Sequence, residues 1–215
     1  AIYKKLVGEF RSIRADEIII RDAVFESRNR HGETQTRLGK ANIQLLKFKV
    51  DSTRDYSNIL SYFIDNIVAE VDTVYIRGQA GKSNVYFTGV LYNTDQRSLD
   101  IKNFVSYAGN EKNPSTSLTA LHCGDLDVKA FILMHSLRAG KVSCAGGQIT
   151  IFTAKQDAQT GKLKNKSFEF PEEFFDEIEI GSLQLGSTTL LVRNKLDPTR
   201  APIRVNDLRF SVNNE

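Results

Sequence analysis

The sequence predicts a mainly β fold, namely a β-sandwich or barrel with one or two packed helices, and an α+β arrangement is the alternative. Three observations lead to this prediction. Short runs rich in β-branched and aromatic residues recur along most of the chain. Turn signals built from Gly, Pro, Asn and Asp separate these runs. One segment instead has apolar residues at helical spacing, which predicts a helix packed on the sheet.

The first predicted element is a long hairpin over residues 17–50. Residues 17–25 are rich in Ile and Val, and residues 43–50 end in an alternation of apolar and charged side chains. That alternation is typical of a half-buried strand. The polar stretch 28–40 lies between the two runs and is predicted to form an extended tip.

One segment is predicted to be helical, and a second is ambiguous between helix and strand. Residues 56–71 carry apolar side chains on one face of a 3.6-residue period: Ile59, Leu60, Phe63, Ile64, Ile67, Val68 and Val71. Polar residues at 51–55 supply capping oxygens. The second segment, 126–138, also fits a helix, although a strand is the alternative for part of it.

The other runs are predicted strands, at 73–77, 84–92, 98–107, 148–155, 163–170, 177–185, 188–195 and 203–212. Hairpin loops are expected at 78–83 and 156–162, a polar loop at 108–117, and turns at 186–187 and 197–202. No Pro/Gly/Ser-rich linker divides the sequence. We therefore expect residues 1–215 to form a single β-rich domain.

Composition narrows the class of protein. The chain has 215 residues, of which 40% are hydrophobic and 26% charged, with only two cysteines. These values exclude a wholly disordered chain, a collagen and a disulfide scaffold. No run approaches the 18 or more apolar residues of a spanning helix, and the first residues lack the apolar core of a signal peptide. We expect no membrane partner and a cytoplasmic or virion location.

Catalytic and metal-binding motifs are not found. The loop Gly78–Ser83 has two residues between its glycines where a phosphate-binding loop has four, so it is interpreted as a hairpin turn. The spacing of His122, Cys123, His135 and Cys144 matches no standard zinc pattern. The chain lacks GxSxG and HExxH. We predict no catalytic residue, no metal and no cofactor, and an enzyme is the less favoured class.

The distribution of charge suggests self-assembly. The net charge is +3, and residues 1–50 carry 11 Lys/Arg against 6 Asp/Glu. The hairpin tip concentrates four cations: Arg28, Arg30, Arg37 and Lys40. A Phe-rich segment at 168–180 carries the opposite sign, with Glu172, Glu173, Asp176 and Glu177. If they meet between subunits, head to tail, the chain is a structural homo-oligomer, as a phage tail or other virion subunit is, and it contacts further structural proteins. Otherwise the tip is a solvated loop.

Single-stranded nucleic-acid binding is the alternative function. Such proteins combine a basic groove with aromatic side chains on which bases stack. Residues 73–107 offer both types, in Arg77, Lys82, Tyr86, Tyr92, Arg97 and Lys102. Tyr86 and Phe87 are adjacent on a predicted strand, so one of them is expected to face the core. A module that binds a small partner is the third hypothesis.

Overall fold

A computed structural model of the chain describes residues 12–51, 67–78, 83–108, 114–127, 130, 136–153, 177–194 and 201–213. Nine strands account for most of these residues, which confirms the mainly β prediction. Their bounds are β1 Ser12–Arg28, β2 Thr34–Asp51, β3 Ile67–Arg77, β4 Ser83–Asn93, β5 Ser98–Ala108, β6 Thr116–Gly124, β7 Ser136–Thr153, β8 Glu177–Asn194 and β9 Ile203–Asn213.

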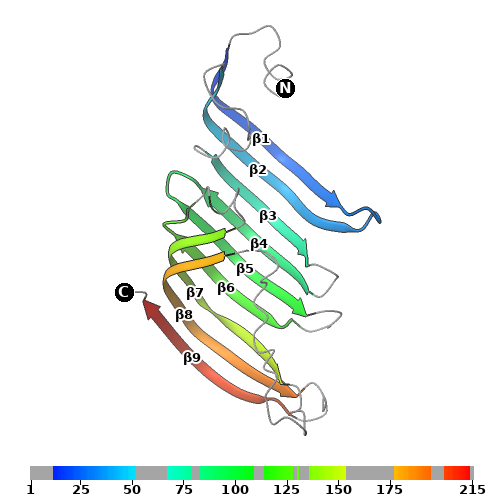
Figure 1. Cartoon of the computed structure of the whole chain (residues 1–215), viewed down its shortest axis with the longest axis vertical. Coiled ribbons are helices and arrows are strands. Elements are labelled where there is room, and N and C mark those ends of the chain that lie inside the picture. The colour runs from blue at the N-terminus through cyan, green and yellow to red at the C-terminus, as the bar shows by residue number, and fades with distance from the viewer. Residues whose placement is uncertain are drawn as a thin grey trace.

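The nine strands form one sheet in which each strand pairs with its neighbours in the chain, in the order β1 to β9 (Figure 1). All pairs are antiparallel except β7 and β8, which are parallel. β1 and β9 lie at opposite ends of the sheet. The pairing does not confirm the expected sandwich or barrel, because the described strands make a single sheet with two edges.

β1 and β2 form a long antiparallel hairpin, in which Glu17 lies opposite Leu46 and Ile20 opposite Ile43. The Oδ1 atom of Asn29 accepts hydrogen bonds from the backbone N–H groups of His31 and Glu33, at 2.9 and 3.0 Å. This local capping explains why the chain turns here. The expected hairpin between β3 and β4 is also present, with the N–H of Gly78 donating to the carbonyl of Ser83.

The helix prediction over 56–71 is wrong for residues 67–71, which belong to β3, while 56–66 lie outside the described residues. Val68 pairs with Gln44 of β2 and with Asn93 of β4. Two flanking strands satisfy the backbone there, so the β-branched side chains adopt the strand that they favour. For 126–138, where helix and strand were both left open, the structure has the strand at 136–138, where β7 begins and Leu137 pairs with Ile178. The predicted strand 163–170 lies outside the described residues.

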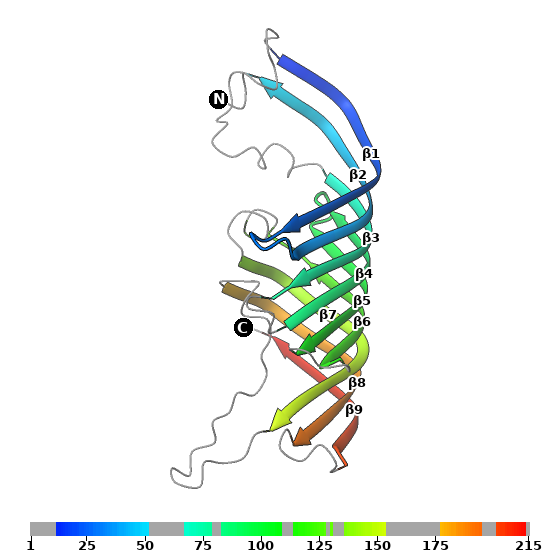
Figure 2. The ribbon, with the colours of Figure 1, turned by 90° about the vertical axis from the view of Figure 1, so that its right-hand side faces the viewer.

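A bend crosses the sheet and shapes the whole molecule (Figure 2). At one height across the sheet, the strand registers skip at least one residue in every strand. Five of the skipped residues have positive φ, for example Lys40 of β2 (φ 47°) and Ala120 of β6 (φ 48°). We call this row of skipped residues the crease, and its members are Asp22, Lys40, Asp72, Gly89, Lys102, Ala120, Ala145, Gly186 and Asp207.

The crease also changes which residues face each side of the sheet. In β3, for example, the successive residues Asp72 and Thr73 are both exposed, whereas Val71 and Val74 on either side are partly buried. Each strand therefore has two arms, one on either side of the crease. Apolar positions are two residues apart within an arm and three residues apart across the crease. This shift keeps the apolar side chains on the concave face along both arms, where regular alternation would move them to opposite faces.

Candidate functional site

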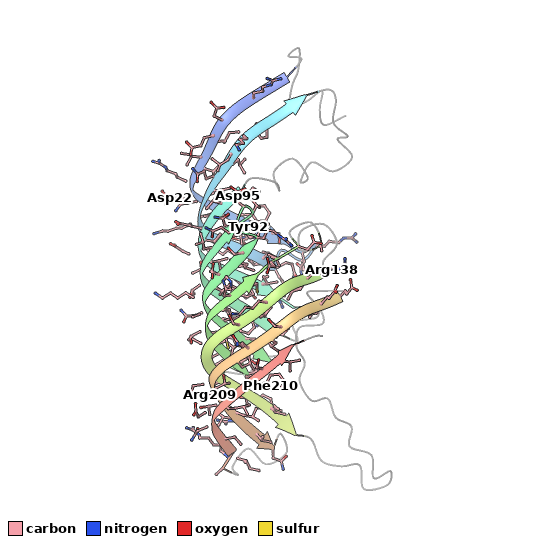
Figure 3. All side chains as sticks on the ribbon, turned by 90° about the vertical axis from the view of Figure 1, so that its left-hand side faces the viewer. Asp22, Tyr92, Asp95, Arg138, Arg209 and Phe210 are labelled. Carbon is pink, nitrogen blue, oxygen red and sulfur yellow. The ribbon has the colours of Figure 1, made fainter. Side chains whose placement is uncertain are left out.

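The concave face of the bent sheet is the candidate site. Figure 3 shows Tyr92 on this side and the crease residue Asp22 on the convex side. The inner positions of β2 to β8 hold no charged residue. We call this face the trough, lined by Leu38, Ala41, Ile43, Leu45, Ile67, Val71, Val74, Ile76, Val85, Phe87, Val90, Tyr92, Leu99, Ile101, Phe104, Leu118, Leu121, Cys123, Val142, Cys144, Ile149, Leu183, Leu185 and Leu190.

The bend of the sheet buries the side chains that lie at the floor of the trough. Beside the crease, Ala41 is 3% exposed, Ile101 7% and Cys144 8%. The rings of Phe87 and Phe104 are neighbours on one wall, with their centroids 5.4 Å apart. Side chains farther along the walls, such as Ile43, are only half-buried. At such positions the described residues leave the walls partly open to solvent.

One wall is completed by the first residues of β7 and β8, which bend over the concave side (Figure 2). Leu126, Leu137 and Ala139 form a buried cluster there, and Tyr92, Leu99 and Val142 pack against it. The place where the first residues of β7 turn over the concave side needs a small residue at position 140, because a Cβ on Gly140 would lie 2.8 Å from the Cβ of Asp125. Across β7, β8 and β9, a hollow of about 380 Å³ includes Cys144, Leu185 and Phe210 in its lining.

Titration behaviour reflects the apolar surroundings of the trough. Burial raises the pKa of Tyr92 to about 12. Its hydroxyl is buried and has no hydrogen-bond partner among the described residues. Burial, together with the charge of Asp100, raises the pKa of the Cys123 thiol to about 11. Neither group is prepared to act as a base or a nucleophile near neutral pH.

The convex face is mostly polar and carries three of the residues considered for nucleic-acid binding. Tyr86 is 43% exposed and lies between Tyr75 and Tyr107, with ring centroids 4.9 and 5.8 Å away. Arg77 makes a 3.0 Å ion pair with Glu33, and Lys102 lies on the crease.

The structure does not gather the whole nucleic-acid set on one surface. Tyr92 lies in the trough, on the opposite face from Tyr86. The guanidinium of Arg97 faces the carbonyl oxygens of Asp125 and Leu126, at 3.4 Å each. Lys82 lies outside the described residues. Phe87 faces the trough while Tyr86 faces outward, as the sequence predicts for adjacent strand residues.

The basic hairpin tip is partly neutralised within the chain. Arg28 makes a 2.7 Å ion pair with Glu26, and Arg37 lies directly opposite Glu26 in the hairpin. A hydrogen bond from Thr34, followed by one from Arg28, lowers the pKa of Glu26 below its usual value. Arg30 is exposed in the turn, whereas Lys40 lies on the crease, away from the tip.

The described end of the acidic segment also has a partner in the chain. Glu177 begins β8, and its carboxylate lies 2.7 Å from the guanidinium of Arg138 in β7. Glu179 lies 3.7 Å from the same guanidinium. Glu172, Glu173 and Asp176 lie outside the described residues. The ion pairs with Arg138 fasten the parallel β7–β8 pair at its first residues.

A histidine and an aspartate lie together next to one of the two cysteines. The Nδ1 atom of His122 lies 2.7 Å from a carboxylate oxygen of Asp100 on the convex face, and Cys123 beside it points into the trough. Both cysteines are free and buried. Within the described ranges no three side chains of His, Cys, Asp or Glu are grouped to hold a metal, and His135 lies outside those ranges.

The fold and the site together define a mainly β protein whose single sheet is bent into an apolar trough. Comparisons with protein-family models, curated proteins and solved structures found no match to this chain. In the part of the chain that the structure describes, no helix has the length and apolar character needed to cross a membrane. The trough was not predicted from the sequence, although the three-residue spacing of apolar positions across the crease in successive strands is a signal of it.

Proposed function

We propose that the trough binds the acyl chains of a lipid. The observation that carries the proposal is the lining, which is predominantly apolar over the inner positions of seven adjacent strands, β2 to β8, and holds no charged side chain there. An apolar surface of this extent is costly to leave in water, at roughly 25 cal/mol for each Å² exposed. A bound apolar chain removes that cost.

Backbone hydrogen bonding favours an acyl chain over an extended peptide as the occupant. The sheet already uses its own N–H and C=O groups in strand pairing, so its concave face offers only side chains. A peptide lying in the trough would bury its own backbone polar groups against Leu, Ile, Val and Phe, without partners. A hydrocarbon chain has no such groups.

The length of the trough fits the same class of ligand. The seven strands β2 to β8, about 4.8 Å apart, give the trough a length of about 30 Å. One acyl chain spans about half of the roughly 30 Å hydrocarbon core of a bilayer. The trough therefore has room for one or two acyl chains along it, with a polar headgroup left at an open end.

The test uses cis-parinaric acid, a fluorescent eighteen-carbon fatty acid, titrated into the full chain. Saturable binding is expected, and Val90→Lys should weaken it at least about tenfold because it places a charge among apolar side chains. Leu91→Lys is the matched control, because Leu91 neighbours Val90 in β4 and faces the convex side, 36% exposed. Competition by saturated fatty acids should strengthen about fourfold for each added methylene.

A second pair of variants is used if circular dichroism shows that Val90→Lys does not fold. Leu121→Asn adds a polar group to the lining, whereas Ala120→Asn adds it on the crease, where φ is +48° and Asn is well tolerated. Loss of binding in Leu121→Asn alone supports the proposal. An absence of saturable binding, or equal losses in both members of a pair, contradicts it.

A self-assembling structural subunit is the second candidate, and it would belong to the same broad class as virion and phage-tail subunits. The specific observation in its favour is that β1 and β9, at the two ends of the sheet, each have one edge without a strand partner among the described residues. Unpaired edges favour association with another strand.

A further inference from the structure

The two end strands expose apolar side chains as well as backbone. In β1, Val24 is 62% exposed and Phe25 58%. In β9, Ile203 is 65% exposed and Phe210 47%. Both strands also carry exposed charges, such as Arg21 in β1 and Asp207 in β9, and charges of this kind commonly protect an edge. Exposed apolar side chains beside an unpaired backbone edge nevertheless mark a place where another strand can add.

The directions of the two edges suit each other. Antiparallel pairing alone would leave the first and ninth strands of a sheet running the same way. The parallel β7–β8 pair reverses this, so that β9 runs antiparallel to β1. A second copy placed beside the first in the same orientation would therefore join β9 to β1 by the antiparallel ladder, which is the slightly more stable kind.

The register of this junction follows when the crease of one copy is aligned with the crease of the next copy. Arg21 and Asp22 face outward in β1, and Asn206 and Asp207 do so in β9. When they are matched, Arg21 lies opposite Asp207, a pair of opposite charge. The same register places Ile20 opposite Leu208 and Phe25 opposite Ile203, all on the concave face. The whole of β9 then lies against residues 15–25 of β1.

We propose that β9 of one copy pairs with β1 of a second copy, so that the sheet and its trough continue from copy to copy. The inference rests on the assembly candidate and names the surface that would carry it. Cross-strand pairs of opposite charge and of apolar side chains are the interactions that stabilise and register neighbouring strands.

A charge-swap experiment on the full chain tests the junction. Sedimentation velocity over a wide concentration range should show association of the unaltered protein. Arg21→Asp alone and Asp207→Arg alone should each weaken association by about threefold to tenfold, because like charges then face each other. A mixture of the two variants should recover it, since every junction between unlike copies again pairs an arginine with an aspartate.

Arg14→Asp is the matched control, because Arg14 is an exposed arginine of β1 that lies outside residues 15–25. It should leave association unchanged. A different outcome is association that is unchanged by the charge swap but weakened when Arg28, Arg30 and Arg37 are changed to Glu. That result would overturn the β9–β1 junction and would still support the assembly candidate. A monomer at every concentration would overturn both. Circular dichroism verifies that each variant is folded.

Discussion

The two cysteines are instructive single residues, because both are free thiols that belong to the apolar lining. Their side chains serve as small apolar groups, which is the usual role of a buried cysteine. Burial acts first and the charge of Asp100 second in raising the pKa of Cys123. The expectation that neither thiol takes part in chemistry therefore has a measurable consequence.

Cys123 should resist alkylation in the folded protein. With a pKa of about 11, only about a thousandth of this thiol is ionised at pH 8, and the thiolate is the reactive form. Iodoacetamide treatment of the Cys144→Ser variant, followed by mass spectrometry, reports on Cys123 alone. The thiol should stay unlabelled in buffer and react fully in urea. Rapid labelling in buffer would contradict this assignment.

At the scale of elements, the crease is what distinguishes these strands from ordinary ones. Its positive φ angles cost energy wherever a side chain is present, as at Lys40 and Ala120. Gly89 avoids that cost, and it also leaves space for the neighbouring strand. A Cβ at Gly89 would lie 2.8 Å from the Cβ of Lys102, closer than side chains tolerate.

Gly89→Ala should therefore destabilise the fold by about 2–4 kcal/mol, from backbone strain and from the contact with Lys102. Gly32→Ala is the control, because Gly32 also has a positive φ, +80°, yet has no atom within 4 Å of the added Cβ. It should cost only about 1 kcal/mol. Urea unfolding followed by circular dichroism measures both. Equal losses would show that the close approach of β4 and β5 is easily relieved.

Residue composition decided which strands could be predicted from the sequence. Strand character was predictable where β-branched and aromatic residues are dense, as in 84–92 and 98–107, although both segments cross the crease. β6 was missed, because it holds no Val, Ile, Phe or Tyr, and its Leu118 and Leu121 are three apart across the crease. Gly186–Ser187 predicts a turn, but β8 continues through it as a bend.

The candidate sites show the same limit. The basic tip can be recognised in the sequence, but the groups that pair with charged side chains inside the chain cannot. Arg77 and Glu33, for example, meet only through the pairing of β2 with β3. Likewise, no local pattern reveals that inner residues of seven strands share one face. That property depends on strand order, which long-range pairing decides.

At the scale of the whole molecule, stability should decrease from the centre of the sheet to its ends. β4, β5 and β6 each have two strand partners, and inner residues such as Val85, 1% exposed, are well buried there. β1 and β9 have one partner each and several exposed apolar side chains. Local opening is easiest where contacts are fewest.

Hydrogen–deuterium exchange measured by mass spectrometry should show this gradient. Amides in β4 to β6 should exchange most slowly, and those in β1 and β9 fastest, in a dilute sample. Raising the protein concentration should slow exchange in β1 and β9 but not in β5, if copies join at those edges. Uniform protection of all nine strands in the dilute sample would contradict the gradient.

The order of the strands has a consequence for biosynthesis. Because each strand pairs with the strand made just before it, β1 to β7 can join the growing sheet one hairpin at a time as the ribosome delivers them, with little loop entropy to overcome. The parallel β7–β8 pair is the exception, since residues 154–176 must be synthesised before β8 can dock. We expect this step to be the slowest addition during synthesis, and until then the edge of β7 stays exposed to chaperones and to wrong partners.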